Sequence, residues 1–276
     1  GTNAIKSKIF KTTPTSIEFI EGMRSPIRLG SEVFNEGKLS QEKLDQVIST
    51  IKSYESIFQK NKIDRYEIVA TSAFRDTSNS EDARRYVETA INHPLRVISG
   101  LEEAQLIRFH PKSNTGKNKI FVDLGGGSTE FFLRDSKGIE IRSFQLGAVR
   151  NMLSKDKKEE WIRLEKWLET IKPRKKLIGI GGNIRSFLQA HDKKELSVKE
   201  LNKKIKEFSR LSTQEKIFKY EFSPDRADVI DHALHIFKFI SEHLMVETIT
   251  STRWGVSDSI GVKLFHEIYS NKINIS

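Results

Sequence analysis

The chain has no cysteine, which excludes disulfide bonds, zinc sites built on thiolates, and cysteine nucleophiles. It also lacks any apolar run that approaches the ~20 residues needed to span a membrane. The best candidate, residues 234–240, is interrupted by Lys238, and no signal peptide is visible. We therefore expect a cytoplasmic protein with no membrane partner.

Acidic residues are in the minority, since 37 Asp and Glu stand against 47 Lys and Arg, for a net charge of +10 at pH 7. Such a charge suits a polyanionic partner (nucleic acid, polyphosphate, nucleotide or anionic lipid), or it is only a solvated basic surface. No nucleic-acid recognition motif is visible, so no specific nucleic acid is expected. The 276 residues suffice for two modest domains with cores of their own.

A glycine-rich segment, residues 123–130, reads Asp-Leu-Gly-Gly-Gly-Ser-Thr-Glu and lies between two short apolar runs typical of strands. It has no lysine at its end, as a Walker A loop needs, and no following helix, as a dinucleotide fingerprint needs. Glycines let backbone N–H groups approach an anion, and a carboxylate at each end suits a divalent cation or a water molecule. The segment predicts a phosphate-holding turn between two strands. The alternative is a tight hairpin whose glycines only supply positive φ.

Apolar periodicity predicts strands alternating with helices, which favours an α/β fold. Helices are expected at about 40–59, 157–171, 183–190 and 257–269, and others are expected to begin near residues 80, 99, 197 and 223. Strands are expected at 5–10, 67–71, 96–98, 139–144, 177–180 and 246–251. Residues 72–79 are expected to form a polar loop, and residues 111–119 a linker. A second glycine turn, residues 181–183, opens a helix and is either an anion site or only a tight turn.

Two adjacent glutamates follow the strand expected at residues 96–98. Ser99 and Glu102 have the spacing of a capping box, in which each side chain bonds the other residue's backbone amide. Glu102 therefore has a local structural role, and Glu103 is left free to point elsewhere. The alternative for Glu103 is an ordinary carboxylate on a helix surface.

Five segments, in the same order and over nearly the whole chain, resemble the exopolyphosphatase/guanosine pentaphosphate phosphohydrolase (Ppx/GppA) family. They are Thr-Ser-Ala-Phe-Arg-Asp-Thr-Ser-Asn at 71–79, Val-Ile-Ser-Gly-Leu-Glu-Glu-Ala at 97–104, the glycine segment at 123–130, Leu-Gly-Ala-Val-Arg at 146–150 and Arg-Ala-Asp-Val-Ile at 226–230. The family belongs to the actin/sugar kinase/Hsp70 superfamily, so the resemblance implies two ribonuclease-H-like domains with a cleft between them. We expect these domains at 1–112, joined by the C-terminal helix 257–272, and at 117–256. The chain resembles a short form, because it ends before the C-terminal helical domain of longer members.

The resemblance implies release of terminal orthophosphate from polyphosphate, or of the 5′-phosphate from pppGpp, with Mg²⁺ as the expected ion and a link to the stringent response. The expected partners are polyphosphate or guanosine penta/tetraphosphate, and a homodimer stays open. By motif, Glu103 is the base for the attacking water, while Asp123 and Glu130 position that water or the metal. The implied phosphate-binding set is Thr2, Asn3, Arg75, Gly125, Gly126, Gly127, Ser128, Thr129, Gly181 and Gly182.

The chain departs from the family pattern at three places. The first Asp of the family's Asp-x-Gly-Thr-Asn loop lies before Gly1, so we expect the natural N-terminus to be missing. The family's Gly-Gly-Thr is Gly-Gly-Asn at 181–183, and its Gly-Val-Arg-x-Gly is Gly-Val-Ser-Asp-Ser at 255–259. The phosphate contact at Asn183 and the substrate contacts near residue 257 are therefore less supported.

Two other functions stay open. A sugar or acetate kinase would share the superfamily fold, although the segments at 97–104 and 226–230 argue against it. A non-catalytic polyphosphate or alarmone sensor would keep the loops without turnover, although the retained Glu103, Asp123 and Glu130 argue for activity. Polyphosphate and pppGpp end in the same phosphoanhydride, so the sequence does not choose between them.

Overall fold

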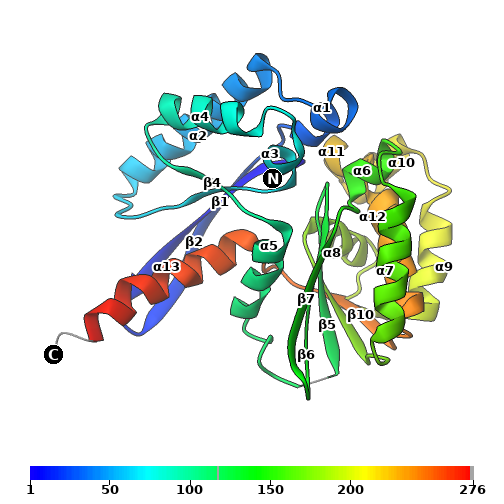
Figure 1. Cartoon of the computed structure of the whole chain (residues 1–276). Coiled ribbons are helices and arrows are strands. Elements are labelled where there is room, and N and C mark those ends of the chain that lie inside the picture. Colours follow the sequence, from blue (N-terminus) through cyan, green and yellow to red (C-terminus); the bar gives the residue numbers. More distant parts are fainter. Residues whose placement is uncertain (117, 274–276) are drawn as a thin grey trace.

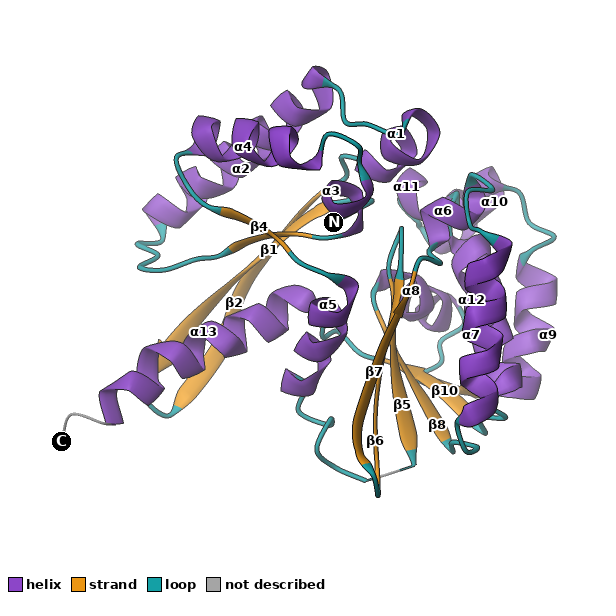
Figure 2. Cartoon of the chain, in the orientation of Figure 1, coloured by secondary structure: helices purple, strands orange, loops and turns teal. Residues whose placement is uncertain are grey.

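In the computed structural model, residues 1–116 and 118–273 are described, with side chains as far as Tyr269. Helices and strands alternate along the chain, so the expected α/β class is confirmed (Figures 1 and 2). None of the described helices is long and apolar enough to cross a bilayer.

A six-stranded sheet organises the second half of the chain, with the strand order β7-β6-β5-β8-β10-β9. The strands are β5 (Lys119–Leu124), β6 (Thr129–Asp135), β7 (Gly138–Phe144), β8 (Lys176–Ile180), β9 (Glu195–Ser197) and β10 (Thr248–Ser251). β5, β8 and β10 run parallel, so their carboxyl ends meet at one edge of the sheet. Sheets of this kind bind ligands at that edge.

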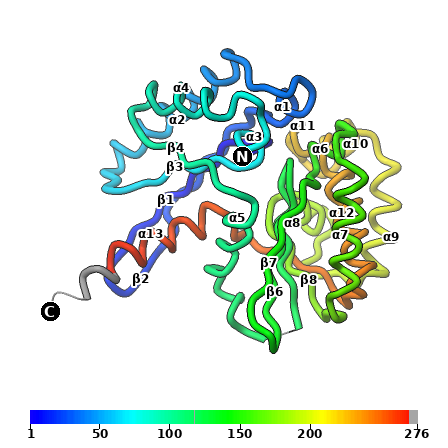
Figure 3. Tube along the Cα trace, viewed as in Figure 1, coloured from blue at the N-terminus to red at the C-terminus, as the bar shows by residue number. Residues whose placement is uncertain are grey.

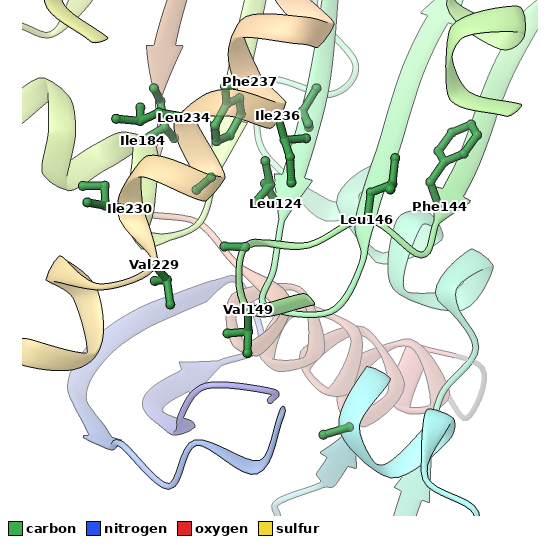
Figure 4. Close-up of a cluster of buried hydrophobic side chains, with 14 of the residues drawn as sticks. Leu124, Phe144, Leu146, Val149, Ile184, Val229, Ile230, Leu234, Ile236 and Phe237 are labelled. Carbon is green, nitrogen blue, oxygen red and sulfur yellow. The ribbon is translucent and has the colours of Figure 1, made fainter. Parts of the chain in front are cut away.

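Both faces of the sheet are buried at its central strands β5, β6 and β8, which are apolar at successive positions. Side chains at alternate positions, such as Phe131 and Leu133, pack with helices α7 (Lys158–Thr170), α9 (Val198–Phe208) and α12 (Ile230–His243). Those helices lie together on one side of the sheet in Figure 1. Figure 4 shows part of this core, in which Leu124 and Leu146 lie near Ile236 and Phe237.

The opposite face of the sheet has its own smaller apolar cluster. Phe121, Phe132 and Ile178 pack there with Ile107 of the 3-10 turn η1 (Ile107–Phe109). That turn follows helix α5 (Gly100–Leu106), which lies on β6 and β7. Since side chains alternate along a strand, every second residue of β5 and β6 faces α5.

The first half contributes two smaller strand pairs. They are the antiparallel hairpin β1 (Ile5–Thr13) and β2 (Ser16–Ser25), and the parallel pair β3 (Ile68–Ala70) and β4 (Leu95–Val97). Their helices are α1 (Leu29–Glu36), α2 (Gln41–Lys60), α3 (Ser72–Asp76) and α4 (Ser80–Ile91). The apolar stripe expected on α2 is buried, and Ser40 caps the helix by accepting a hydrogen bond from the Lys43 amide at 3.2 Å.

The C-terminal helix α13 (Val256–Ile273) returns to the first half and lies along β1 (Figure 3). Lys8 pairs with Asp258 at 2.5 Å, and Gly261 lets Phe10 approach the helix closely. The expected domain ranges, 1–112 with 257–272 and 117–256, stay predictions, as does the pair of ribonuclease-H-like domains. Residue 117 itself lies outside the described residues.

Two local predictions are wrong. Residues 72–76 form helix α3 instead of a loop, and the single helix expected from residue 223 is two helices, α11 (Pro224–Ala227) and α12. At the break, Asp225 and Asp228 are held by Arg24 and Arg28 from the first half, so tertiary ion pairs override helix continuity. The periodicity also missed β2, β9, α1, α6 (Ala148–Met152) and α10 (Thr213–Tyr220).

Candidate active site

Three carboxylates from separate elements meet on the face of the sheet that α5 covers. Asp123 at the end of β5 and Glu130 at the start of β6 are directly paired across the two strands. Glu103 lies in the first turn of α5, with Ser99 as the cap. The helix lies close to β7 because Gly100 has no side chain: a Cβ there would stand 2.1 Å from Ser143 Oγ.

The capping box predicted at Ser99 is present, which separates the roles of the two glutamates. The Glu102 carboxylate accepts from the Ser99 amide at 2.7 Å, and Ser99 Oγ accepts from the Glu102 amide at 3.1 Å. These bonds lower the pKa of Glu102. Glu103 is buried instead, and its Oε2 atom has no hydrogen-bond partner within the described part of the chain. A buried carboxylate oxygen without a hydrogen bond is costly, so this oxygen is available to bind a proton, a water molecule or a cation.

Glu103 and Asp123 line one narrow cavity, together with Ile180, Trp254 and neighbouring residues, which has no room for a water molecule in this conformation; Glu130 does not line it. Burial, and then the nearby Asp123 charge, raise the pKa of Glu103 to about 7 against the opposing effect of Arg75. Burial also raises the pKa of Asp123 to about 6, against the opposing effect of Lys6. Glu103 is therefore poised to exchange a proton near neutral pH.

Glu130 has a different environment. It is 1% exposed, and Ser143 Oγ donates a hydrogen bond to its Oε1 at 2.9 Å. Burial and then the Glu103 and Asp123 charges hold the pKa of Glu130 well above its ordinary value. Burial and the neighbouring negative charges therefore favour the protonated form of Glu130.

Two of the three glycines of the first turn, Gly126 and Gly127, are required by close approach and not by backbone conformation. None of Gly125, Gly126 and Gly127 has a positive φ, so the simple hairpin explanation is wrong. A Cβ at Gly126 would lie 2.9 Å from Thr2 Cβ, and one at Gly127 would lie 2.5 Å from Ser72 Oγ. The turn therefore packs between Thr2, just before β1, and Ser72 at the start of α3.

The amides of this turn differ in their hydrogen bonding, and Gly127 and Ser128 are buried. The Gly125 amide donates to the Ser128 carbonyl at 3.0 Å. Among the described residues, the amides of Gly126, Gly127 and Ser128 donate no hydrogen bond. Adjacent free N–H groups at a glycine turn form an anion-binding concavity.

Arg75 connects the glycine turn to Glu103. Its guanidinium donates to the Ile98 carbonyl at 2.8 Å and to Ser128 Oγ at 3.4 Å, and lies 3.8 Å from Glu103 Oε2. The expected base, the expected basic residue and the glycine turn are therefore neighbours.

The second glycine turn leads into helix α8 (Gly182–Ala190) beside the same edge. Gly181 has a φ of +100°, and its Cβ position is 3.6 Å from Asp123 Oδ1. Gly182 lies under the guanidinium of Arg226, which bonds the Asn183 side chain. The departure from threonine at position 183 thus gives an amide oxygen that holds this arginine.

Several other members of the expected phosphate-binding set already have protein partners. Thr2 bonds Ser72 through the two hydroxyls, and the Asn3 amide donates to the Asp225 carboxylate at 3.1 Å. The buried Thr129 hydroxyl donates to the Leu146 carbonyl at 2.6 Å. Their contact with phosphate stays a prediction.

Sequence reasoning missed a group of cations around Asp123. Lys6 keeps an exposed surface, yet desolvation lowers its pKa. The Asp123 charge opposes this shift, whereas the Arg226 and Arg185 charges lower the pKa of Lys6 further. Desolvation, then the Arg24 charge, lowers the pKa of Arg226 to about 10. Cations that depress one another's pKa in this way are crowded together and favour a polyanion between them.

Arg226 and Arg150 lie in two of the segments that carried the family resemblance, so the sequence offered a signal for them. Arg185 and Lys6 gave none, because Arg185 lies two residues after Asn183 and Lys6 lies three residues after Asn3, outside the motifs.

No group of three His, Cys, Asp or Glu side chains within the described residues is arranged to hold a metal ion. Mg²⁺, however, is commonly bound through one or two carboxylates, with water and substrate phosphates as its other ligands. Asp123 and Glu130, directly paired across β5 and β6, fit that pattern, since burial raises the pKa of both and a cation would favour their ionised forms.

Known proteins resemble this chain over most of its length. It is 28% identical over 251 aligned residues to the bifunctional 3-dehydroquinate synthase/phosphatase of Fusobacterium nucleatum, covering 79% of this chain and 38% of that protein. The chain therefore spans less than half the length of that curated relative.

Solved structures share the fold. An exopolyphosphatase from Cytophaga hutchinsonii superimposes with a TM-score of 0.82 at 19% identity, covering 97% of this chain and 96% of that one. An Aquifex aeolicus member of the Ppx/GppA family superimposes with a TM-score of 0.76 at 23% identity, covering 98% and 95%. At these identities the similarity establishes the fold alone. The family profile extends over residues 8–267 and includes the glycine turn and all three carboxylates, so this chain belongs to the Ppx/GppA phosphatase family.

Proposed function

We propose that this chain is a phosphohydrolase that releases terminal orthophosphate from inorganic polyphosphate, or the 5′-phosphate of pppGpp, by attack of water. The observation that carries the proposal is Glu103: a buried carboxyl with a pKa of about 7, an unpartnered oxygen, and a cavity shared with Asp123. Family membership supports the same reaction class.

Glu103 is the proton acceptor in this proposal. In its ionised form, Oε2 accepts a proton from the attacking water, a role that contributes roughly 10²–10⁴-fold in enzymes. Its pKa near 7 keeps it both ionised in part and basic enough to receive that proton at neutral pH. The capped position of Glu102 leaves Glu103 as the glutamate that faces the cavity.

The glycine turn and Arg75 stabilise the charge of the transferred group. Phosphoryl transfer spreads negative charge over the equatorial oxygens, so catalysis depends on positioning and electrostatics. The free amides of Gly126, Gly127 and Ser128 supply fixed donors, and Arg75 adds a full positive charge beside Ser128. Asp123 and Glu130 would hold Mg²⁺, which supplies further neutralisation of phosphate charge when bound.

The cations near the second turn favour a substrate with several phosphates. Lys6, Arg185 and Arg226 lie close enough to perturb one another and lie near Asp123. A chain of anhydride-linked phosphates, or a nucleotide with two phosphate groups, satisfies more of these charges than a single phosphate does.

The test is phosphate release from long-chain polyphosphate and from pppGpp, each with Mg²⁺, by the wild type, Glu103→Gln and Glu102→Gln. We expect Glu103→Gln to lose about 10²-fold or more of kcat while remaining folded. Glu102→Gln is the matched control: it lies next in sequence, caps the same helix and should retain activity within a few-fold.

Near-normal turnover by Glu103→Gln would remove Glu103 from this role. Binding of either substrate to the wild type without phosphate release would identify a sensor in place of an enzyme. Phosphate transfer from ATP to a sugar or acetate would identify a kinase.

A further inference from the structure

Arg150 is a buried cation that the proposed chemistry does not use. Its Nε donates to the Gly127 carbonyl at 2.9 Å, and its Nη2 lies 2.5 Å from Asp76 Oδ2. The guanidinium also stacks on the Phe34 ring, with 4.1 Å to the ring centre. One side chain therefore ties the glycine turn to α3 and α1, which lie in the first half of the chain.

The contact completes a row of bonds to the carbonyl oxygens of the glycine turn. The Ala148 amide bonds the Gly125 carbonyl at 3.0 Å, and the Val149 amide bonds the Gly126 carbonyl at 2.8 Å. These two donors belong to the first turn of α6. The third carbonyl, of Gly127, receives its hydrogen bond from the Arg150 side chain instead.

The direction of these carbonyls fixes the direction of the amides. A peptide unit is planar and trans, so the C=O of one residue and the N–H of the next point in opposite directions. With the carbonyls of residues 125–127 turned toward α6 and Arg150, the amides of Gly126, Gly127 and Ser128 point away from them. Those are the amides without a hydrogen-bond partner in the described part of the chain.

The last of these peptides needs an anchor, because glycine restricts its backbone less than any other residue. We propose that Arg150 is a positioning residue: it fixes the peptide between Gly127 and Ser128 so that the Ser128 amide faces the phosphoryl group being transferred. This inference rests on the proposed function of the same turn. It assigns Arg150 a role through Gly127 and no contact with substrate.

Asp76 supports the arginine in two ways. It is the carboxylate that compensates the buried charge of Arg150, and its other oxygen lies 3.5 Å from Arg75 Nε. Burial lowers the pKa of Arg150, and Asp76 opposes that shift. The two arginines therefore share one carboxylate while they reach the two adjacent residues Gly127 and Ser128.

Lysine cannot replace this arginine. A guanidinium presents several donors in a fixed plane and stacks on an aromatic ring, whereas an ammonium is a point charge without that geometry. In Arg150→Lys the pair with Asp76 can form, but the simultaneous bond to the Gly127 carbonyl is lost. This variant keeps the positive charge of residue 150 and removes its hydrogen bond to the Gly127 carbonyl.

The test compares Arg150→Lys with the wild type and with Arg163→Ala. Arg163 is a chemical match, since it stacks on Phe144 at 4.2 Å and donates to the Ser143 carbonyl at 2.8 Å. It does not contact the glycine turn. Measurements are kcat and KM for phosphate release, the thermal unfolding midpoint, and the affinity for inorganic phosphate by calorimetry.

We expect Arg150→Lys to unfold within a few degrees of the wild type and to lose about 10²-fold in kcat with KM changed by less than about threefold, as for loss of one fixed transition-state donor. Arg163→Ala should keep kcat. Arg150→Lys with kcat within threefold of the wild type would overturn the inference, and so would an equal kcat loss in Arg163→Ala. If the wild type releases no phosphate, the proposed function fails. The inference is then decided by phosphate affinity, which Arg150→Lys must weaken and Arg163→Ala must not.

Discussion

The two glycine turns beside Asp123 place different chemistry on the two sides of one site. The first, at residues 125–127, is surrounded by carboxylates, has free amides and needs glycine because Thr2 and Ser72 press against it. The second, at residues 181–182, lies among cations, and Gly181 needs its left-handed φ of +100°. In the proposed function, the first turn therefore holds the phosphoryl group that reacts, and the second turn binds the rest of the polyanion. Each prediction below separates these two roles.

The largest effect is expected from Gly127→Ala. The new Cβ would stand 2.5 Å from Ser72 Oγ and 2.7 Å from Phe34 Cζ, so the turn must shift away from α3. Displacing the amides should cost about 10²-fold or more in kcat, by the measure of a lost transition-state donor. Steady-state phosphate release measures it, with Gly22→Ala as a control, since a Cβ at Gly22 would meet its nearest atom at 3.4 Å and the backbone there is not left-handed. An unchanged kcat would show that the first turn does not hold the reacting group.

The next effect is a pH dependence from Glu103. Because its pKa is raised to about 7 and the base must be ionised, kcat should fall about tenfold per pH unit well below 7. The free energy of unfolding should change in the opposite direction, rising as the pH falls below 7. Between its ordinary pKa of 4.5 and about 7, the folded state binds more protons at Glu103 than the unfolded state does. The free energy of unfolding therefore falls as pH rises through this window.

The same linkage predicts that Glu103→Gln stabilises the protein at pH 8 relative to the wild type, by about 1–3 kcal/mol, and much less at pH 4. Urea unfolding at the two pH values measures the difference. A Glu103→Gln variant that is less stable at pH 8 would mean that the carboxylate is held by partners in the folded state.

The smallest effect is expected from Arg185→Gln at the second turn. Arg185 is half-buried on α8, and the neighbouring Arg253 charge adds to the desolvation that lowers its pKa. Loss of one cation should raise KM for long polyphosphate by about 3–10-fold, equivalent to about 1 kcal/mol, and leave kcat nearly unchanged. The increase should shrink at high salt, because screening weakens the attraction.

Arg84→Gln is the control for this variant, since Arg84 pairs with Glu81 and Glu88 on α4. A fall in kcat at constant KM in Arg185→Gln would show that the second turn takes part in the chemical step and contradict the separate roles of the two turns.

Local sequence rules were sufficient for part of the site. The capping box at Ser99 and Glu102 forms as predicted, and it leaves Glu103 facing the cavity. The strand–turn–strand arrangement of residues 119–135 is also confirmed, and it pairs Asp123 with Glu130. Each of these features depends on residues within a few positions of one another, where hydrogen bonding and strand pairing follow directly from spacing.

Such local rules could not predict the short helix α3, the break before α12, or why the first turn requires glycine. Helix α3 has five residues, too few for apolar periodicity to be visible. The break before α12 depends on Arg24 and Arg28, about 200 residues earlier in the chain. Positive φ was only the alternative explanation of the turn at 125–127, and neither explanation foresaw that the side chains of Thr2 and Ser72 lie against Gly126 and Gly127.

The sequence alone determined the α/β alternation, the first glycine turn and the freedom of Glu103, because these follow from neighbouring residues. Only the tertiary structure decided that Lys6, Arg185 and Arg226 gather near Asp123 and the second turn, and that Asp76 pairs with Arg150 across 74 positions. Charges act through space and leave no periodic pattern in the chain. Their partners are therefore known only once the fold has brought them together.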